Sequence, residues 1–244
     1  MKLKNEMKYI NLRKLIAKEK VQILTFAAIS LVIIVFTGIL SILNPLSFQS
    51  FLGNFNPLII MPILAVLGIF IVIFLLMRKW FVVFNRENLK AMFLFYIPAI
   101  ILPFFSILID IFFKYPKEIH KLVPESLFFY PVMGYVAEIV FHMAPLSLLL
   151  FTLNLLFKSL NFEKGLWFSI SIVSLIEPLF QTTFSPSHFP LWITIFSAVH
   201  LYVFNFLQLY LIKRYDFLSM YSFRLVYYMI WHIIWGSIRI NILF

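Results

Sequence analysis

The sequence predicts an all-α protein, a polytopic helical transmembrane bundle of about seven spans, with an eighth if a long span breaks at a proline. Hydrophobic residues make up 63% of the 244 residues and charged residues only 12%, whereas soluble domains are ~45–50% apolar and ~25% charged. The apolar residues fall in runs of the ~20 residues that a helix needs to cross a bilayer. The chain has no cysteine, which excludes disulfides and cysteine-based metal or nucleophile sites.

Seven apolar runs are long enough to cross a membrane. The expected spans are Val21–Leu43, Pro57–Met77, Ala91–Phe113, Ser126–Phe157, Gly165–Phe184, Pro190–Ile212 and Phe217–Phe244. The fourth is too long for one straight crossing, so we expect it to tilt or to extend into the interface. The chain is thus a tail, residues 1–20, followed by one transmembrane domain, residues 21–244.

The tail is expected to be a short basic amphipathic helix that lies on the cytoplasmic membrane surface. Its apolar residues are Met7, Ile10, Leu12, Leu15 and Ile16. A solvated basic tail is the alternative.

Lysines and arginines predict a cytoplasmic N-terminus, because positive charge is enriched on that side of a membrane. Fifteen of the 20 then lie inside: Lys2, Lys4, Lys8, Arg13, Lys14, Lys18, Lys20, Arg78, Lys79, Arg86, Lys90, Lys158, Lys164, Lys213 and Arg214. Lys114, Lys117 and Lys121 lie outside, and an odd number of spans leaves the C-terminus outside. The basic residues behind the net charge of +10 then orient the chain in the membrane and contact anionic lipid headgroups. The charge therefore does not indicate a nucleic-acid partner. We expect an integral protein of a prokaryotic cell membrane.

Three polar residues, one on each of three helices, are expected about midway through their spans. They are Glu138 in the fourth, Glu177 in the fifth and His232 in the last, and His142 follows Glu138 in the fourth. Ionisable side chains at this depth usually face the interior of the bundle and mark function. Glu138 and His142, four residues apart, share one helix face. Pro178 is expected to kink the helix beside Glu177, and another backbone is expected to approach Gly236, one turn after His232.

Two carboxylates and two imidazoles form a plausible set of ligands for a divalent metal such as zinc. The same four residues without a metal could hold a water, with Glu138 or Glu177 as its general base. A structural hydrogen bond between packed helices and a proton or ion pathway remain alternatives for Glu138 and His142.

Three further polar residues carry weaker expectations. His200 is expected to bond Asn205, Gln208 or a backbone carbonyl. Asp110, near the outer end of its span, is expected to extend to water. Arg224 is expected near the cytoplasmic edge, where it meets lipid phosphate or a buried carboxylate.

From about Ser126 to the C-terminus the chain resembles the CPBP family, the CAAX-protease and bacteriocin-processing (Abi) group of intramembrane proteases. That family shows E-E-x-x-x-R, F-x-x-x-H and H-x-x-x-N on successive helices. Here Ala137-Glu138-Ile-Val-Phe-His142 has the first frame, Val173-Ser-Leu-Ile-Glu177 the second and His232-Ile-Ile-Trp-Gly236 the third. Phe196-Ser-Ala-Val-His200 also matches the second motif, one helix later.

The resemblance implies an intramembrane endopeptidase, similar to a CAAX prenyl protease, that hydrolyses a peptide bond of a membrane-associated peptide or protein near the cytoplasmic face. Only Glu138 and His232 keep the family's residues, and Ala137 replaces the glutamate that is understood to activate water. The alternative is a degenerate member that serves in bacteriocin self-immunity or binds a peptide without cleaving it. A transporter is disfavoured, because the chain shows no duplicated halves.

Overall fold

The computed structural model describes residues 12–157, 161–183 and 190–244, and within these ranges it confirms an all-α fold without strands. The α-helices are α1 (Leu12–Lys18), α2 (Lys20–Leu43), α3 (Gln49–Leu52), α4 (Pro57–Arg78), α5 (Leu89–Phe113), α6 (Glu125–Ala137), α7 (Ala144–Leu156), α8 (Phe162–Val173), α9 (Ile176–Thr183), α10 (Leu191–Arg214), α11 (Phe217–Tyr228) and α12 (Gly236–Leu243). The π-helices η3 (Glu138–Met143) and η4 (Met229–Trp235) join α6 to α7 and α11 to α12. Short 3₁₀ turns η1 (Arg86–Asn88) and η2 (Lys117–Ile119) lie in two connections.

Six helical segments of the described chain are long and apolar enough to cross a membrane, and the protein is therefore an integral membrane protein. They are Lys20–Leu43, Pro57–Arg78, Met92–Phe113, Glu125–Leu156, Phe162–Thr183 and Leu191–Arg214. The seventh expected span is also helical from 217 to 243, but it is not among the six. Buried Arg224 and Arg239 make it more polar than the others. The fifth span breaks at Ser174 and Leu175, before Pro178, and the break adds no eighth crossing.

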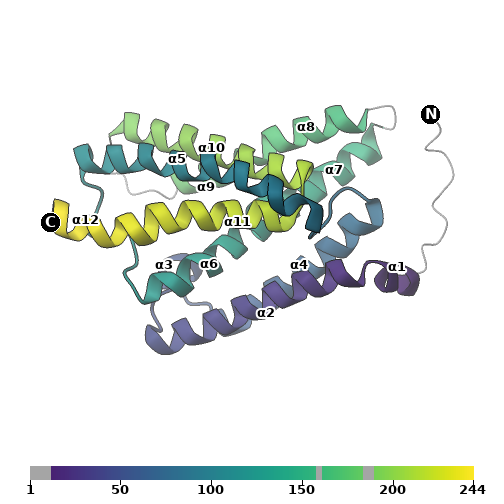
Figure 1. Ribbon diagram of the computed structural model, residues 1–244, viewed down its shortest axis with the longest axis horizontal. Helices are drawn as coiled ribbons and strands as arrows, with labels where there is room; N and C mark the ends of the chain where they lie inside the picture. The colour runs from purple at the N-terminus through teal and green to yellow at the C-terminus, as the bar shows by residue number, and fades with distance from the viewer. Residues whose placement is uncertain (1–11, 158–160, 184–189) are drawn as a thin grey trace.

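The helices run along the long axis of an elongated bundle and alternate in direction (Figure 1). α2 packs on α4 and α6, whereas α11 packs on α5, α6 and α10. The helix formed by α11, η4 and α12 therefore lies among elements from both halves of the chain, and its polar residues are placed in the interior. The C-terminus lies at the opposite end of the bundle from α1 (Figure 1).

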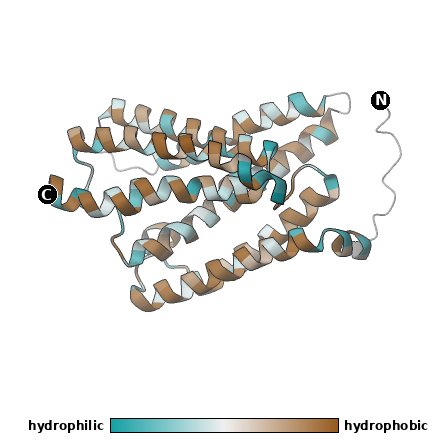
Figure 2. Ribbon diagram, viewed as in Figure 1, coloured by the Kyte–Doolittle hydropathy of each residue, from teal (hydrophilic) through white to brown (hydrophobic). Residues whose placement is uncertain are grey.

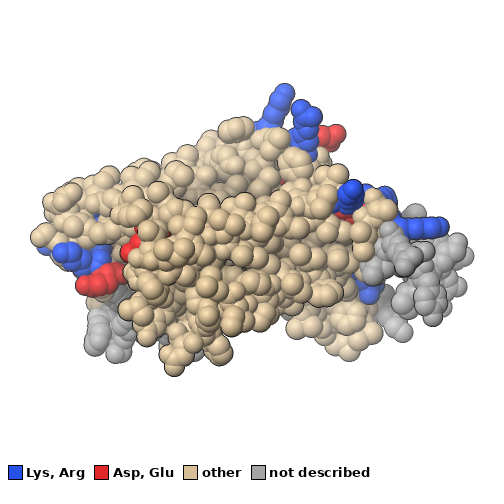
Figure 3. Space-filling view, turned by 90° about the horizontal axis from the view of Figure 1, so that it is seen from below, with Lys and Arg blue, Asp and Glu red and all other residues tan. Residues whose placement is uncertain are grey.

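The outer surface between the ends of the bundle is apolar. Large side chains such as Phe70, Phe93 and Phe112 are exposed along it, and hydrophobic residues cover most of the helix length (Figure 2). Lys and Arg gather at the two ends on the face seen in Figure 3. This distribution suits a body surrounded by lipid along its length, with charges in the headgroup layers.

At the α1 end, a connection between α4 and α5 fixes the start of α11. Asp216 caps α11 by accepting hydrogen bonds from the Ser219 backbone and hydroxyl at 2.8 and 2.6 Å. Its second carboxylate oxygen accepts from the backbone of Asn85 and the side chain of Asn88, both at 3.0 Å. This cap sets the position of Arg224, two turns further along the helix.

At the other end, the expectation that Asp110 extends to water is wrong. Asp110 is fully buried and accepts two hydrogen bonds from Arg239, from Nε at 2.6 Å and from Nη2 at 2.7 Å. Trp235 Nε1 donates to the same carboxylate at 2.6 Å. Arg239 also donates to the carbonyls of Tyr115 and Pro116. The ion pair therefore ties α12 to the end of α5, where water is not needed to solvate the carboxylate.

The expected N-terminal helix is present over Leu12–Lys18 as α1, and Glu19 separates it from α2 with non-helical backbone angles. Met7 and Ile10 lie outside the described residues.

Candidate functional site

Glu138 and His142 contact each other directly, as their spacing predicted. Glu138 Oε2 and His142 Nδ1 are 2.6 Å apart, and both side chains are 0% exposed. They open and nearly close the π-helix η3, a wider turn that interrupts α-helices mostly at functional sites. Because a carboxylate accepts at Nδ1, that nitrogen carries a hydrogen, and in the neutral imidazole Nε2 then keeps the free lone pair.

Glu177 reaches the same cluster from the start of α9. It is 2% exposed, and its two oxygens accept from Arg224 Nη1 and Nη2 at 3.1 and 2.9 Å. Gln181, one turn along α9, donates to Glu177 at 3.2 Å. The break between α8 and α9, at Ser174 and Leu175, places Glu177 in the first turn of α9.

Arg224 is the centre of the cluster. It is fully buried and donates five hydrogen bonds, which uses every N–H of a guanidinium. Besides the two to Glu177, Nε donates to Glu138 at 2.7 Å, Nη1 to the Tyr228 hydroxyl at 2.9 Å and Nη2 to Gln208 Oε1 at 2.8 Å. Of the two expected partners, Arg224 therefore meets buried carboxylates and not lipid phosphate.

Gln208 and Gly134 complete the surroundings of this arginine. Gln208 accepts from Arg224 and donates through Nε2 to Glu138 Oε1, so its amide orientation is fixed. A Cβ at Gly134 would lie 3.3 Å from Arg224 Cδ, which means that a glycine leaves room for the arginine stem. The sequence analysis names Gln208 only as a possible partner of His200. An arginine and a glutamine that lie within apolar runs nevertheless indicate that buried hydrogen-bond acceptors are close to them.

One buried polar atom in the cluster has no hydrogen-bond partner among the residues that the structure describes. His142 Nε2 lies 3.8 Å from Glu177 Oε2, beyond hydrogen-bond distance. The pair of Glu138 and His142 thus has the arrangement of a general base, in which a carboxylate fixes the ring through one nitrogen and the other nitrogen is left basic. With two carboxylates and one guanidinium, the cluster carries a formal charge of −1 unless a proton resides on His142 or on a carboxyl group.

His232, the fourth residue of the expected site, contacts a different set of residues. Its Nδ1 is 3.0 Å from His120 Nδ1, and its ring stacks on Tyr130 with centroids 4.2 Å apart. His120 belongs to the connection before α6, where burial, with nearby Arg239 adding to it, lowers the pKa of this imidazole to about 4. The side chain of His120, rather than another backbone, approaches Gly236: a Cβ there would lie 2.9 Å from His120 Cβ.

The expected zinc ligands therefore do not form one set. Glu138, His142 and Glu177 meet around Arg224, a cation that hydrogen-bonds to both carboxylates and offsets one of their two negative charges, and His232 hydrogen-bonds to His120. In the part of the chain that the structure describes, no group of three His, Cys, Asp or Glu side chains could hold a metal ion.

The expected partners of His200 are also corrected. Its Nε2 lies 3.0 Å from the Tyr227 hydroxyl and 3.3 Å from Ser106 Oγ. Asn205 is buried, and neither atom of its amide has a hydrogen-bond partner among the described residues. His200 packs α10 against α5 and α11 rather than joining Gln208 in the cluster.

No family model, curated protein or solved structure matches this chain.

Proposed function

We propose that this chain is a membrane-embedded hydrolase that cleaves a peptide bond, with His142 as its general base. One observation carries the proposal: Glu138 holds His142 through Nδ1 at 2.6 Å, while Nε2 is buried and has no hydrogen-bond partner in the described part of the chain. The base is then the imidazole rather than Glu138 or Glu177, since Arg224 donates to both carboxylates.

In this reaction His142 Nε2 takes a proton from water as the water oxygen bonds to the peptide carbonyl carbon. The carbonyl electron pair moves to oxygen, and the Tyr228 hydroxyl is suited to stabilise that charge. This hydroxyl accepts from Arg224 at 2.9 Å, so its own hydrogen is available for a developing oxyanion. When the C–N bond breaks, His142 returns the proton to the amine, and the products are a carboxyl group and an amine.

The position of the cluster supports a substrate that enters from one membrane face. Arg224 lies seven residues beyond Phe217, the first residue of α11, which places it about 10 Å from that end of the helix. This is the end that carries α1 (Figure 1) and that the charge distribution predicts to be cytoplasmic. The proposed substrates are therefore membrane-associated peptides cut near that face.

The test uses the full chain in proteoliposomes with a pool of apolar membrane peptides, whose fragments are read by mass spectrometry. The wild-type protein is expected to cleave, and His142→Gln and Glu138→Gln are expected to lower the rate by about 10²–10⁴-fold. His200→Gln is the matched control, because this histidine is largely buried but bonded to Tyr227 and Ser106. Cleavage by His142→Gln at the wild-type rate would refute the proposal.

A second candidate function is peptide binding without cleavage, as expected of a degenerate CPBP-type protein that serves in bacteriocin self-immunity. It is favoured by three of the five hydrogen bonds of Arg224, which occupy both carboxylates, and by Ala137, which stands where the CPBP family has a glutamate. In this case the wild-type protein retains a peptide but releases no fragments. Cleavage that appears only in Ala137→Glu would favour this candidate, whereas cleavage by the wild type would exclude it.

A further inference from the structure

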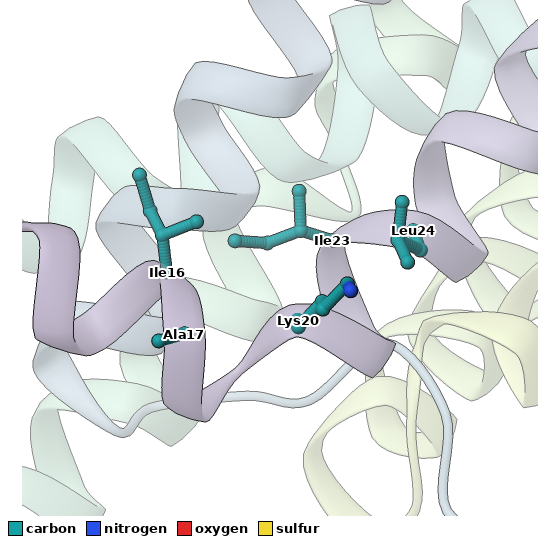
Figure 4. Close-up of a pocket in the computed structure, with 5 residues that line it drawn as sticks. All are labelled: Ile16, Ala17, Lys20, Ile23 and Leu24. Carbon is teal, nitrogen blue, oxygen red and sulfur yellow. The ribbon is translucent and has the colours of Figure 1, made fainter.

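A hollow opens at the elbow between α1 and α2 (Figure 4). Its volume is about 410 Å³, and it is lined by Ile16 and Ala17 of α1 and by Lys20, Ile23 and Leu24 of α2. Glu19 turns the chain between the two helices with φ −97° and ψ 20°. Four of the five lining residues are apolar, and Lys20 is the single cation among them.

The surroundings of this hollow combine exposed apolar side chains with unbalanced positive charge. Ile16 of α1 is 40% exposed and Leu24 of α2 is 55% exposed. Lys14, Lys18 and Lys20 are exposed. Glu19 is 3.9 Å from the exposed Lys18 ammonium, a contact that stabilises little in water. An anionic, partly apolar occupant is complementary to both features.

We propose that this hollow binds an anionic phospholipid of the surrounding leaflet, with part of an acyl chain against Ile16, Ala17 and Ile23 and the phosphate at the Lys20 ammonium. Lysines near a membrane surface attract anionic lipids by about 1 kcal/mol each, and apolar side chains at the interface bind acyl chains. A free phosphate would use the lysine but leave the apolar walls in contact with water. A zwitterionic lipid would fill the hollow without the same electrostatic attraction.

The headgroup contact is tested on the full chain in detergent micelles, titrated with dioleoylphosphatidylglycerol or with dioleoylphosphatidylcholine. Native mass spectrometry counts the lipids that each protein molecule retains. The phosphatidylglycerol affinity is expected to exceed that for phosphatidylcholine, and Lys20→Gln is expected to lower it about fivefold, the factor that ~1 kcal/mol represents. Lys90→Gln is the control, because Lys90 is an exposed lysine of α5 that does not line the hollow.

The acyl contact is tested by filling the hollow with Ala17→Phe, which keeps every lysine. This variant is expected to lower phosphatidylglycerol retention, whereas Ala28→Phe, at an exposed position further along α2, is expected to leave it unchanged. Equal affinity for the two lipids, or a loss in Lys20→Gln no larger than in Lys90→Gln, would overturn the proposal. So would unchanged retention in Ala17→Phe, since the lipid would then be bound elsewhere.

Discussion

At the scale of residues, the central arrangement is a guanidinium whose five donors all find acceptors inside an apolar bundle. Arg224 joins Glu138 of η3, Glu177 of α9 and Gln208 of α10. Each buried charge would cost several kcal/mol if left alone. Their mutual pairing therefore makes this cluster possible, and it also ties together helices that are distant in the sequence.

Arg224→Lys keeps the positive charge but removes the planar fork. A lysine has three donors on one atom and cannot bond both oxygens of Glu177 in the same way. We expect the variant to lose about 2 kcal/mol of unfolding free energy, because some of the buried oxygens that accept hydrogen bonds from the guanidinium lose their donor. Thermal unfolding in detergent measures the loss. Arg86→Lys, at an exposed position, is the control and should change stability by less than about 0.5 kcal/mol.

The contact between Glu138 and His142 could be predicted because it is local: residues four apart on one helix share a face. The partners of Arg224 and of Asp110 could not, since apolar periodicity does not say which helices are neighbours. The buried residues nevertheless carried a signal. Arg224 and Arg239 lie in one apolar span and needed carboxylates, which Glu138, Glu177 and Asp110 supply.

At the scale of elements, the two π-helices are the features that hydrophobic patterning did not predict. The sequence predicts that the span Ser126–Phe157 is too long for one straight crossing, and the structure has one helical segment there, Glu125–Leu156. The hydrophobic pattern gives no measure of the wider turn within it. η3 carries Glu138 and His142, and η4 carries His232. In both places the wider turn coincides with polar residues. His232 hydrogen-bonds to His120, in the connection that precedes α6, rather than to the Arg224 cluster.

The packing of His120 against Gly236 predicts the effect of adding one methyl group at position 236. Gly236→Ala places a Cβ 2.9 Å from His120 Cβ and 3.0 Å from Cγ, so His120 must shift from its position. We expect a loss of about 1–3 kcal/mol of unfolding free energy, as for other overpacked sites. Gly38→Ala is the matched control, because nothing lies within 4 Å of its Cβ, and alanine favours the helix by up to ~1 kcal/mol. An equally stable Gly236→Ala would mean that His120 does not pack there.

At the scale of the whole molecule, the apolar surface and the charged ends agree on how the bundle lies in a membrane (Figures 2 and 3). Its direction is a prediction from lysines and arginines alone. The α1 end carries most of them, and the positive-inside bias places that end in the cytoplasm.

Labelling of single cysteines tests this orientation directly, because the chain contains no cysteine of its own. Glu87→Cys and Glu118→Cys introduce exposed thiols near opposite ends of the bundle. In intact cells, a maleimide that cannot cross the membrane should label Glu118→Cys at once and Glu87→Cys only after permeabilisation. The reverse pattern would show that the N-terminus lies outside.

The central claim is that charged groups from separate helices meet in one buried cluster, and a double-mutant cycle between Glu177 and Arg224 tests it most directly. The unfolding free energies of Glu177→Gln, Arg224→Met and the double variant are measured in detergent. Arg224→Met is expected to lose about 3–5 kcal/mol, because it leaves two buried carboxylates without their cation. Glu177→Gln is expected to lose less, about 1–3 kcal/mol, because Arg224 keeps its ion pair with Glu138. The double variant is expected to lose less than the sum by about 1–3 kcal/mol. Losses that add within ~0.5 kcal/mol would show that the two side chains do not interact, and would contradict the cluster.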